Sequence, residues 1–277
     1  MLTKILKTLA FVLTIIFVIA AIWLANGLIG NPISKALAKS AAEKHLRENY
    51  SDTDFELDGV TYSFKDGYYH ANVSSESSID SHFALLINSF GQVQDDYYDH
   101  YVKTGWNTAA RIDADYRKIV EELFESASFP FNAYIAYGEI WFISEEYKDA
   151  PDVPDYALIT EELTLDAFYN ANELGKNHGK LTVYLYDDEV TVERLAKILL
   201  EIRTCFDEAG VGFHAIDCVL EPTRNDDRNH EYARVEVMDF LYSDIYAEGI
   251  VERVDTANEA AKEYYRLADL EKGLEME

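Results

Sequence analysis

Three side chains that could form a catalytic cluster alternate along a short stretch of the chain: Ser78, Asp80 and His82. A serine nucleophile needs a histidine base within hydrogen-bond distance and donors that stabilise the oxyanion. On one β-strand, residues two apart share a face, but their Cα atoms lie roughly 6.5–7 Å apart and their side chains run parallel. The three groups therefore do not converge. We expect Ser78 in a turn, Asp80 bonding backbone nearby and His82 on the solvated face of a sheet.

Candidate metal and cofactor motifs are equally weak. The segment 224–229 (RNDDRN) and the set Asp149, Asp152 and Asp155 offer oxygen ligands, but they lack the spacing and the closing glutamate of a calcium loop. The glycines of the segment 209–214 (AGVGFH) lack phosphate-binding spacing, and we expect them to end a helix. We therefore assign no catalytic, cofactor-binding or metal-binding residue, and we expect solvated acidic loops.

The two cysteines are predicted to be unpaired. Cys205 falls near the end of an expected helix and Cys218 well into the following strand. If the strand runs back beside the helix, this offset exceeds the Cα separation of about 4.4–6.8 Å that a disulfide requires. Two cysteines without a Cys-x-x-Cys motif do not form a zinc site. We expect two buried thiols that act as small hydrophobic side chains.

Tyrosines occur in pairs and clusters that allow two interpretations. Tyr97, Tyr98 and Tyr101 form one group, and Tyr264 and Tyr265 form another. Tyrosine is suited to a recognition groove because its ring is apolar and its hydroxyl is polar. Tyrosine also fills the seam between packed layers of secondary structure, and we expect these tyrosines to lie in such a seam.

The chain is strongly acidic. It has 277 residues and a net charge of −27, from 24 lysines and arginines against 51 acidic residues. Two of the basic residues and none of the acidic ones precede residue 33, so the remainder carries −29. Such a charge repels phosphate backbones, and it disfavours nucleic acid as a partner. With 48% hydrophobic residues, the chain has enough apolar matter for one or two folded domains.

An uncharged, mostly apolar stretch over residues 8–30 predicts a helix that inserts into the lipid bilayer. About 20 helical residues span the roughly 30 Å hydrocarbon core. A cleaved signal peptide is the alternative, but it needs a shorter apolar run and small residues at the cleavage site. Trp23 lies where a small residue is wanted before Ala25. We expect an uncleaved single-pass anchor in the cell membrane.

The segment 33–104 is predicted to be one helix followed by four antiparallel strands. Asn31 and Pro32 form a helix-start signal, and the apolar stripe continues to about residue 49. Asp66-Gly67 marks a tight hairpin turn. The expected strands cover residues 55–64, 68–75, 81–88 and 93–102.

Residues 105–277 alternate between helical and strand patterns, which predicts an α/β sandwich with a mixed sheet. The last helix is expected to open at a capping box of Thr256 and Glu259, and an earlier one at Thr191. Other expected helices cover 106–127 and 165–174, and expected strands cover 131–143, 180–188, 211–221 and 231–242. The fold class is thus α+β, with an anchor over 1–32 and domains over 33–104 and 105–277.

The segment 33–103 resembles the N-terminal domain of the YfjL-like proteins of Gram-positive bacteria. The most specific parts are Tyr-x-Phe-Lys-Asp-Gly-Tyr-Tyr at 62–69 and Ser-Ser-x-Asp-x-x-Phe at 77–83. More distantly, the segment is similar to PepSY modules, which are found on extracytoplasmic proteins. The rest of the chain is similar to the C-terminal region of the same family. The resemblance implies a membrane-attached protein without an assigned activity, and it supplies no catalytic residues.

The side of the membrane has opposing indications. Lys35, Lys39, Lys44 and Arg47 follow the span and slightly favour a cytoplasmic body, although long domains translocate largely regardless of charge. The family resemblance implies an extracytoplasmic body, which we expect.

The sequence favours a binding or inhibitory module over an enzyme. The reasons are the anchor, the helix-and-sheet domain and the lack of a catalytic constellation. We expect the body to hold a protein or peptide partner near the membrane, along an exposed sheet edge. Two alternatives stay open: an enzyme of unrecognised type in the C-terminal domain, and a cytoplasm-facing regulator tethered by the same helix.

Overall fold

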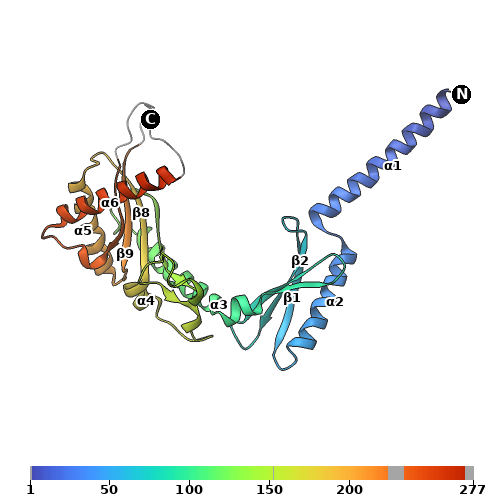
Figure 1. The fold of residues 1–277 in the computed structure, drawn as a ribbon, viewed down its shortest axis with the longest axis horizontal. Helices are drawn as coiled ribbons and strands as arrows, with labels where there is room; N and C mark the ends of the chain where they lie inside the picture. The colour runs from blue at the N-terminus through green and yellow to red at the C-terminus, as the bar shows by residue number, and fades with distance from the viewer. Residues whose placement is uncertain (1, 152, 224–233, 272–277) are drawn as a thin grey trace. The chain divides into compact units, whose positions relative to one another are not determined.

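The computed structural model of the protein describes residues 2–151, 153–223 and 234–271 (Figure 1). The chain divides into an N-terminal unit, Met1–Thr108 with Thr164–Asp166, and a C-terminal unit, Ala109–Leu163 with Ala167–Glu277. The predicted α+β class is confirmed: an apolar helix leads into an antiparallel sheet, and a mixed sheet follows.

The first two helices, α1 (Leu2–Ile29) and α2 (Pro32–Asn49), are separated by a short break. Gly30 has a φ of +71°, and Asn31 caps α2 because its Oδ1 accepts the N–H of Ser34 at 2.7 Å. Within the described residues, one helical segment is long and apolar enough to cross a membrane, and it begins at Leu9. This segment fits a membrane anchor or a signal sequence.

Sheet A, in the N-terminal unit, is an antiparallel meander in the order β1-β2-β3-β4. Its strands are β1 (Phe55–Ser63), β2 (Tyr68–Ser75), β3 (His82–Ile87) and β4 (Val93–Asp96). In Figure 1, α2 runs alongside this sheet, and its Ala38, Ala42 and Leu46 are buried in the shared core. The small side chains of Ala38 and Ala42 let the helix approach the strands closely.

The fourth predicted strand was wrong beyond residue 96. A π-helical turn, η1 (Asp99–Lys103), follows β4 instead. The Oδ1 of Asp96 accepts the N–H of Tyr98 at 3.0 Å, which bends the chain away from the sheet. The ring of Tyr98 then packs within 5.2–5.7 Å of the rings of Tyr50, Phe55 and Phe83. Packing of this partly buried ring among other aromatic rings stabilises the turn.

Sheet B, in the C-terminal unit, has the order β10-β9-β8-β5. It is mixed as predicted, because β8 and β9 are parallel and the other pairs are antiparallel. Its strands are β5 (Ala133–Ile140), β8 (Gly179–Asp187), β9 (Ala215–Pro222) and β10 (Val235–Leu241). Two short strands, β6 (Phe142–Ile143) and β7 (Leu158–Ile159), form a separate parallel pair.

Four helices accompany sheet B: α3 (Trp106–Phe124), α4 (Ala171–His178), α5 (Val192–Ala209) and α6 (Ile250–Glu271). The core lies where alternate residues of β8 and β9 meet α3 and α5, and it includes Leu181, Val183, Ile198 and Cys218. The predicted caps of α5 are confirmed: Thr191 accepts the N–H of Arg194, and Gly210 ends the helix with a φ of +69°.

Two predicted helix starts were wrong. The expected helix 165–174 begins only at Ala171. Asp166 has a φ of +59°, which a right-handed helix excludes, and Asn170 caps the helix by accepting the N–H groups of Asn172 and Glu173. The expected start at Thr256 lies inside α6, where its hydroxyl donates to the carbonyl of Glu252 at 2.9 Å. Helix α6 begins six residues earlier because Arg253 bonds the carbonyls of the preceding turn.

Both edges of sheet B are closed at one point by a helix side chain. On β5, the N–H of Ile140 donates to Oδ1 of Asp113 in α3 at 2.9 Å. On β10, the N–H of Glu236 donates to Oδ1 of Asn258 in α6 at 3.0 Å. Edge donors left open would invite pairing with another strand.

Cys205 and Cys218 are unpaired and buried, as predicted. Burial raises the pKa of both thiols above the ordinary value. They therefore stay protonated at neutral pH and act as packing groups.

Candidate binding pocket

The structure places Ser78, Asp80 and His82 in a loop junction of the N-terminal unit. The hydroxyl of Ser78 and the N–H of Asp80 both donate to Oδ1 of Asp166, at 3.0 and 2.9 Å. Asp80 is buried, and its Oδ2 accepts the N–H of Asp166 at 3.0 Å and the hydroxyl of Thr108 at 2.9 Å. His82 begins β3 with an exposed side chain. As expected, Asp80 bonds backbone; these contacts fix a loop and form no base–nucleophile pair.

The acidic segments considered as calcium sites lie only in part within the described residues. Among the residues that the structure describes, no group of three metal-ligating side chains lies close enough to hold an ion. Asp149 and Asp155 are exposed. Asp152 and the segment 224–229 lie outside the described residues.

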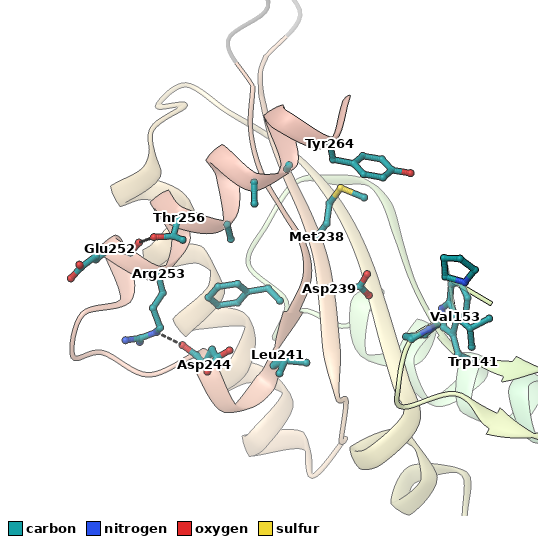
Figure 2. Close-up of a pocket in the computed structure, with 16 residues that line it drawn as sticks. Trp141, Val153, Met238, Asp239, Leu241, Asp244, Glu252, Arg253, Thr256 and Tyr264 are labelled. Atoms are coloured by element: carbon teal, nitrogen blue, oxygen red, sulfur yellow. Dashed lines mark hydrogen bonds between the residues drawn. The ribbon is translucent and has the colours of Figure 1, made fainter. Parts of the chain in front are cut away.

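A pocket of about 990 Å³ opens in the C-terminal unit between β10, α6 and the segment that follows β6. Figure 2 shows Trp141 and Val153 on one side and Met238 and Tyr264 on the other. Most of its wall is apolar: Trp141, Pro151, Val153, Pro154, Met238, Phe240, Leu241, Ala257, Ala260, Ala261 and Tyr264. A cavity of this size and lining is typical of a site that binds a small molecule or a side chain.

A β-bulge shapes the strand side of the pocket. The register of β10 against β9 shifts between Val237 and Phe240. Asp239, inside this bulge, has a φ of +46°, which is uncommon for a residue other than glycine. Its N–H donates to Oδ1 of Asp217 at 2.7 Å, which holds the strained backbone. The bulge brings both Met238 and Asp239 to the pocket, although strict alternation would point them to opposite faces.

Lys180, which does not itself line the pocket, holds the pocket residue Asp239 in an ion pair. Its Nζ lies 2.8 Å from Oδ1 of Asp239 and 2.9 Å from Oδ2 of Asp217, and its side chain is only 8% exposed. The hydroxyl of Tyr156 donates to Oδ1 of Asp239 at 2.7 Å. We call Lys180, Asp217, Asp239 and Tyr156 the charge cluster.

The pKa values in the charge cluster favour a structural role for Lys180 and Tyr156 over a catalytic one. Burial lowers the pKa of Lys180, but its hydrogen bonds with Asp239 and Asp217 outweigh that effect and raise the pKa overall. Burial and the bond to Asp239 raise the pKa of Tyr156 well above its usual range. A nucleophilic lysine or a tyrosinate base needs a lowered pKa. Both groups therefore remain protonated at neutral pH, and they hold the bulge in place.

Arg253, at the other end of the pocket, is occupied by the protein's own backbone. Its guanidinium donates to the carbonyls of Asp244, Tyr246 and Glu248 at 2.6–2.9 Å, and it stacks on the Tyr246 ring. Figure 2 shows the bond to Asp244. Arg253 thus fixes the start of α6, and its donors are used by the fold.

Sequence reasoning missed this pocket. The tyrosines of α6 were expected in a seam between layers, and this was wrong for Tyr264, which is exposed and lines the pocket. Tyr98, by contrast, lies in the predicted seam. The one local signal was the segment 235–241 (VEVMDFL), where Asp239 interrupts the strand alternation beside the apolar Met238 and Phe240.

The fold and pocket define an α+β protein with an N-terminal apolar helix and a ligand-sized cavity in its second unit. The YfjL-like N-terminal domain matches residues 5–97, and the YfjL-like C-terminal domain matches residues 115–255. The chain therefore belongs to the YfjL-like family, whose function is unknown.

Comparisons with curated proteins and with solved structures give no further indication of function. No curated protein matches the chain. Among solved structures, a DUF5037 family protein from Ruminococcus gnavus ATCC 29149 is similar at 14% sequence identity, with a TM-score of 0.22. The alignment covers 79% of this chain and 98% of that chain.

Proposed function

We propose that the protein is a non-catalytic binding protein, anchored in the cell membrane by α1, with its body outside the cytoplasm. The pocket of the C-terminal unit would take an apolar side chain of a protein or peptide partner. The observation that carries this proposal is the mostly apolar wall of a 990 Å³ pocket next to an edge strand. A cavity that exposes Met238, Leu241 and Tyr264 gains free energy when an apolar group displaces its water.

The state of the polar groups supports binding over catalysis. Lys180 is held by two carboxylates, and Arg253 is held by three carbonyls. These charges position the walls of the pocket, and neither is presented as a reacting group. The pocket therefore fits recognition by shape and apolar contact, with Asp239 and Arg253 already fixed in place.

The rim of the pocket indicates the charge of the partner. Asp244 and Glu252 line it, and Asp239 is 52% exposed at its side chain. Arg253 keeps its positive charge, but the three carboxylates outnumber it, so the rim is acidic on balance. A segment in which an aromatic or aliphatic side chain is flanked by lysine or arginine would match both the wall and the rim.

The outer edge of β10 is open to a partner over only a short length. Asn258 already accepts the N–H of Glu236, so a partner strand cannot pair along the whole of β10. Side-chain insertion beside Met238 is compatible with this closure. The partner is thus expected to bind through one or two anchoring side chains.

The proposal is tested by selecting peptides from a random display library on the full chain in lipid nanodiscs. We expect the enriched peptides to share an apolar residue flanked by basic residues. Met238→Arg should weaken the binding of a selected peptide at least tenfold, because it fills the pocket and adds a positive charge. Fluorescence anisotropy measures the dissociation constants.

Phe168→Arg provides the matched control. Phe168 is an exposed aromatic residue of the same unit that does not line the pocket, and the substitution adds the same charge. We expect its affinity to stay within twofold of the unmodified chain. Enrichment no greater than on empty nanodiscs, or equal binding by the Met238→Arg chain, would contradict the proposal.

A further inference from the structure

The end of sheet A nearest the anchor is tied to the C-terminal end of α1. The hydroxyl of Tyr62 donates to the carbonyl of Gly27 at 3.1 Å, and the N–H of Asn31 donates to the hydroxyl of Tyr69 at 2.9 Å. A Cβ on Gly30 would lie 2.8 Å from atoms of both tyrosines. This close packing holds the exit of α1 against β1 and β2.

Two hairpin turns lie at this same end. Tyr62 pairs with Tyr69, Tyr69 with Ile87, and Ile87 with Val93, so one row of residues crosses all four strands. The β1–β2 turn and the β3–β4 turn extend just past that row. The second turn lies on α2, because a Cβ on Gly91 would be 3.1 Å from the carbonyl oxygen of Leu37.

Large apolar side chains are exposed on this end. Phe64 in the first turn is 62% exposed, and Phe90 in the second is 82% exposed. Ile33, in the first turn of α2, is exposed as well. We call Ile33, Phe64 and Phe90 the anchor-side face. Large apolar side chains at turn tips are costly in water, yet phenylalanine and aliphatic side chains are favourable at the headgroup–acyl boundary of a bilayer.

The charge of this end differs from that of the body. Lys35 and Lys65 are exposed next to the anchor-side face, and no acidic residue precedes Glu43 in the chain. Asp66 is the acidic residue of the β1–β2 turn, and it lies 2.8 Å from His70. The rest of the chain beyond residue 32 is strongly negative. Lysines beside aromatic side chains suit the phosphate layer of a membrane.

We infer that the anchor-side face rests in the phospholipid headgroup region of the bilayer that α1 crosses. Ile33, Phe64 and Phe90 would enter the interface, while Lys35 and Lys65 would meet lipid phosphates. The inference rests on α1 remaining in the membrane, which is part of the proposed function. It adds a second contact with the lipid that would hold the N-terminal unit against the surface.

Depth-dependent fluorescence quenching tests this inference. A fluorophore with a maleimide group is attached to Phe64→Cys, Phe90→Cys or Ile79→Cys in the full chain, reconstituted in phosphatidylcholine–phosphatidylglycerol vesicles. Ile79 is the control, because it is 67% exposed in the β2–β3 connection at the opposite end of the sheet. The native cysteines are buried, so the unmodified chain serves as the labelling blank.

A phosphatidylcholine with a nitroxide on its headgroup should quench the labels at positions 64 and 90 at least threefold more than the label at 79. Equal quenching at all three positions would overturn the inference while leaving the anchor intact. Labels at positions 64 and 90 that are shielded from water but not quenched by the lipid nitroxide would also overturn the inference. A second copy of the protein would then cover the anchor-side face. Release of the chain by alkaline extraction would overturn both the inference and the proposed anchor.

Discussion

At the scale of single residues, the stability of the C-terminal unit depends on the ion pairs of the charge cluster. Removing the ammonium of Lys180 would leave Asp217 and Asp239 facing each other without a counter-charge. Breaking a buried ion pair from one side is strongly destabilising, because the remaining charge stays desolvated. The half-exposed Asp239 moderates the effect, since water can still reach its carboxylate.

We expect Lys180→Met to lower the free energy of unfolding by roughly 2–3 kcal/mol. Urea unfolding of the solubilised full chain measures this change. Lys176→Met is the control, because Lys176 pairs with Glu173 on the surface at 2.7 Å and methionine keeps its apolar stem. Such an exposed pair contributes within about 0.5 kcal/mol. Equal unfolding midpoints for the two variants would show that Lys180 is not the required counter-charge.

At the scale of elements, α4 packs closely on the core because Gly175 carries no side chain, beside the apolar Ala171 and Leu174. A Cβ on Gly175 would lie 2.2 Å from the Tyr116 ring and 2.8 Å from the carbonyl oxygen of Gly212. The hydroxyl of Tyr116 donates to that same carbonyl at 2.8 Å. The ring of Tyr116, on α3, thus fills the space that a side chain on α4 would need.

Gly175→Ala should therefore destabilise the C-terminal unit by about 2–3 kcal/mol, because a tightly packed core cannot accept the added methyl group. Near-ultraviolet circular dichroism during urea unfolding follows the loss of tertiary packing. Gly59→Ala is the comparison, since a Cβ there would have no atom within 4 Å, and its effect should stay within about 0.5 kcal/mol. A similar loss in both variants would rule out the packing explanation.

Elements were predicted well where their signals are local. Asn31 and Thr191 cap helices through bonds to residues three positions later, and Gly210 ends a helix by its own φ. The charge cluster has no such signal, because its residues come from separate segments that only the fold brings together. The capping box at Thr256 failed for another reason: Arg253 bonds carbonyl oxygens five to nine residues before it, and α6 therefore begins before Thr256.

At the scale of the whole molecule, the side of the membrane is the most consequential prediction. We expect protease added to intact cells to remove the signal of an antibody against the C-terminal tail. A cytoplasmic protein in the same sample should stay intact until lysis, which controls for leakage. Protection of the tail until lysis would place the body inside, and the distribution of lysines and arginines would then be the better guide.

The partly closed edges of sheet B would have a further consequence if the proposed anchor confines the protein to the plane of a membrane. Copies held in one membrane meet far more often, and in more uniform orientation, than copies in free solution. Strand edges that stayed open would let neighbouring sheets join into a continuous ribbon. Asp113 and Asn258 each occupy one donor on an outer strand, so under the proposed anchoring they would work against edge-to-edge pairing of this sheet.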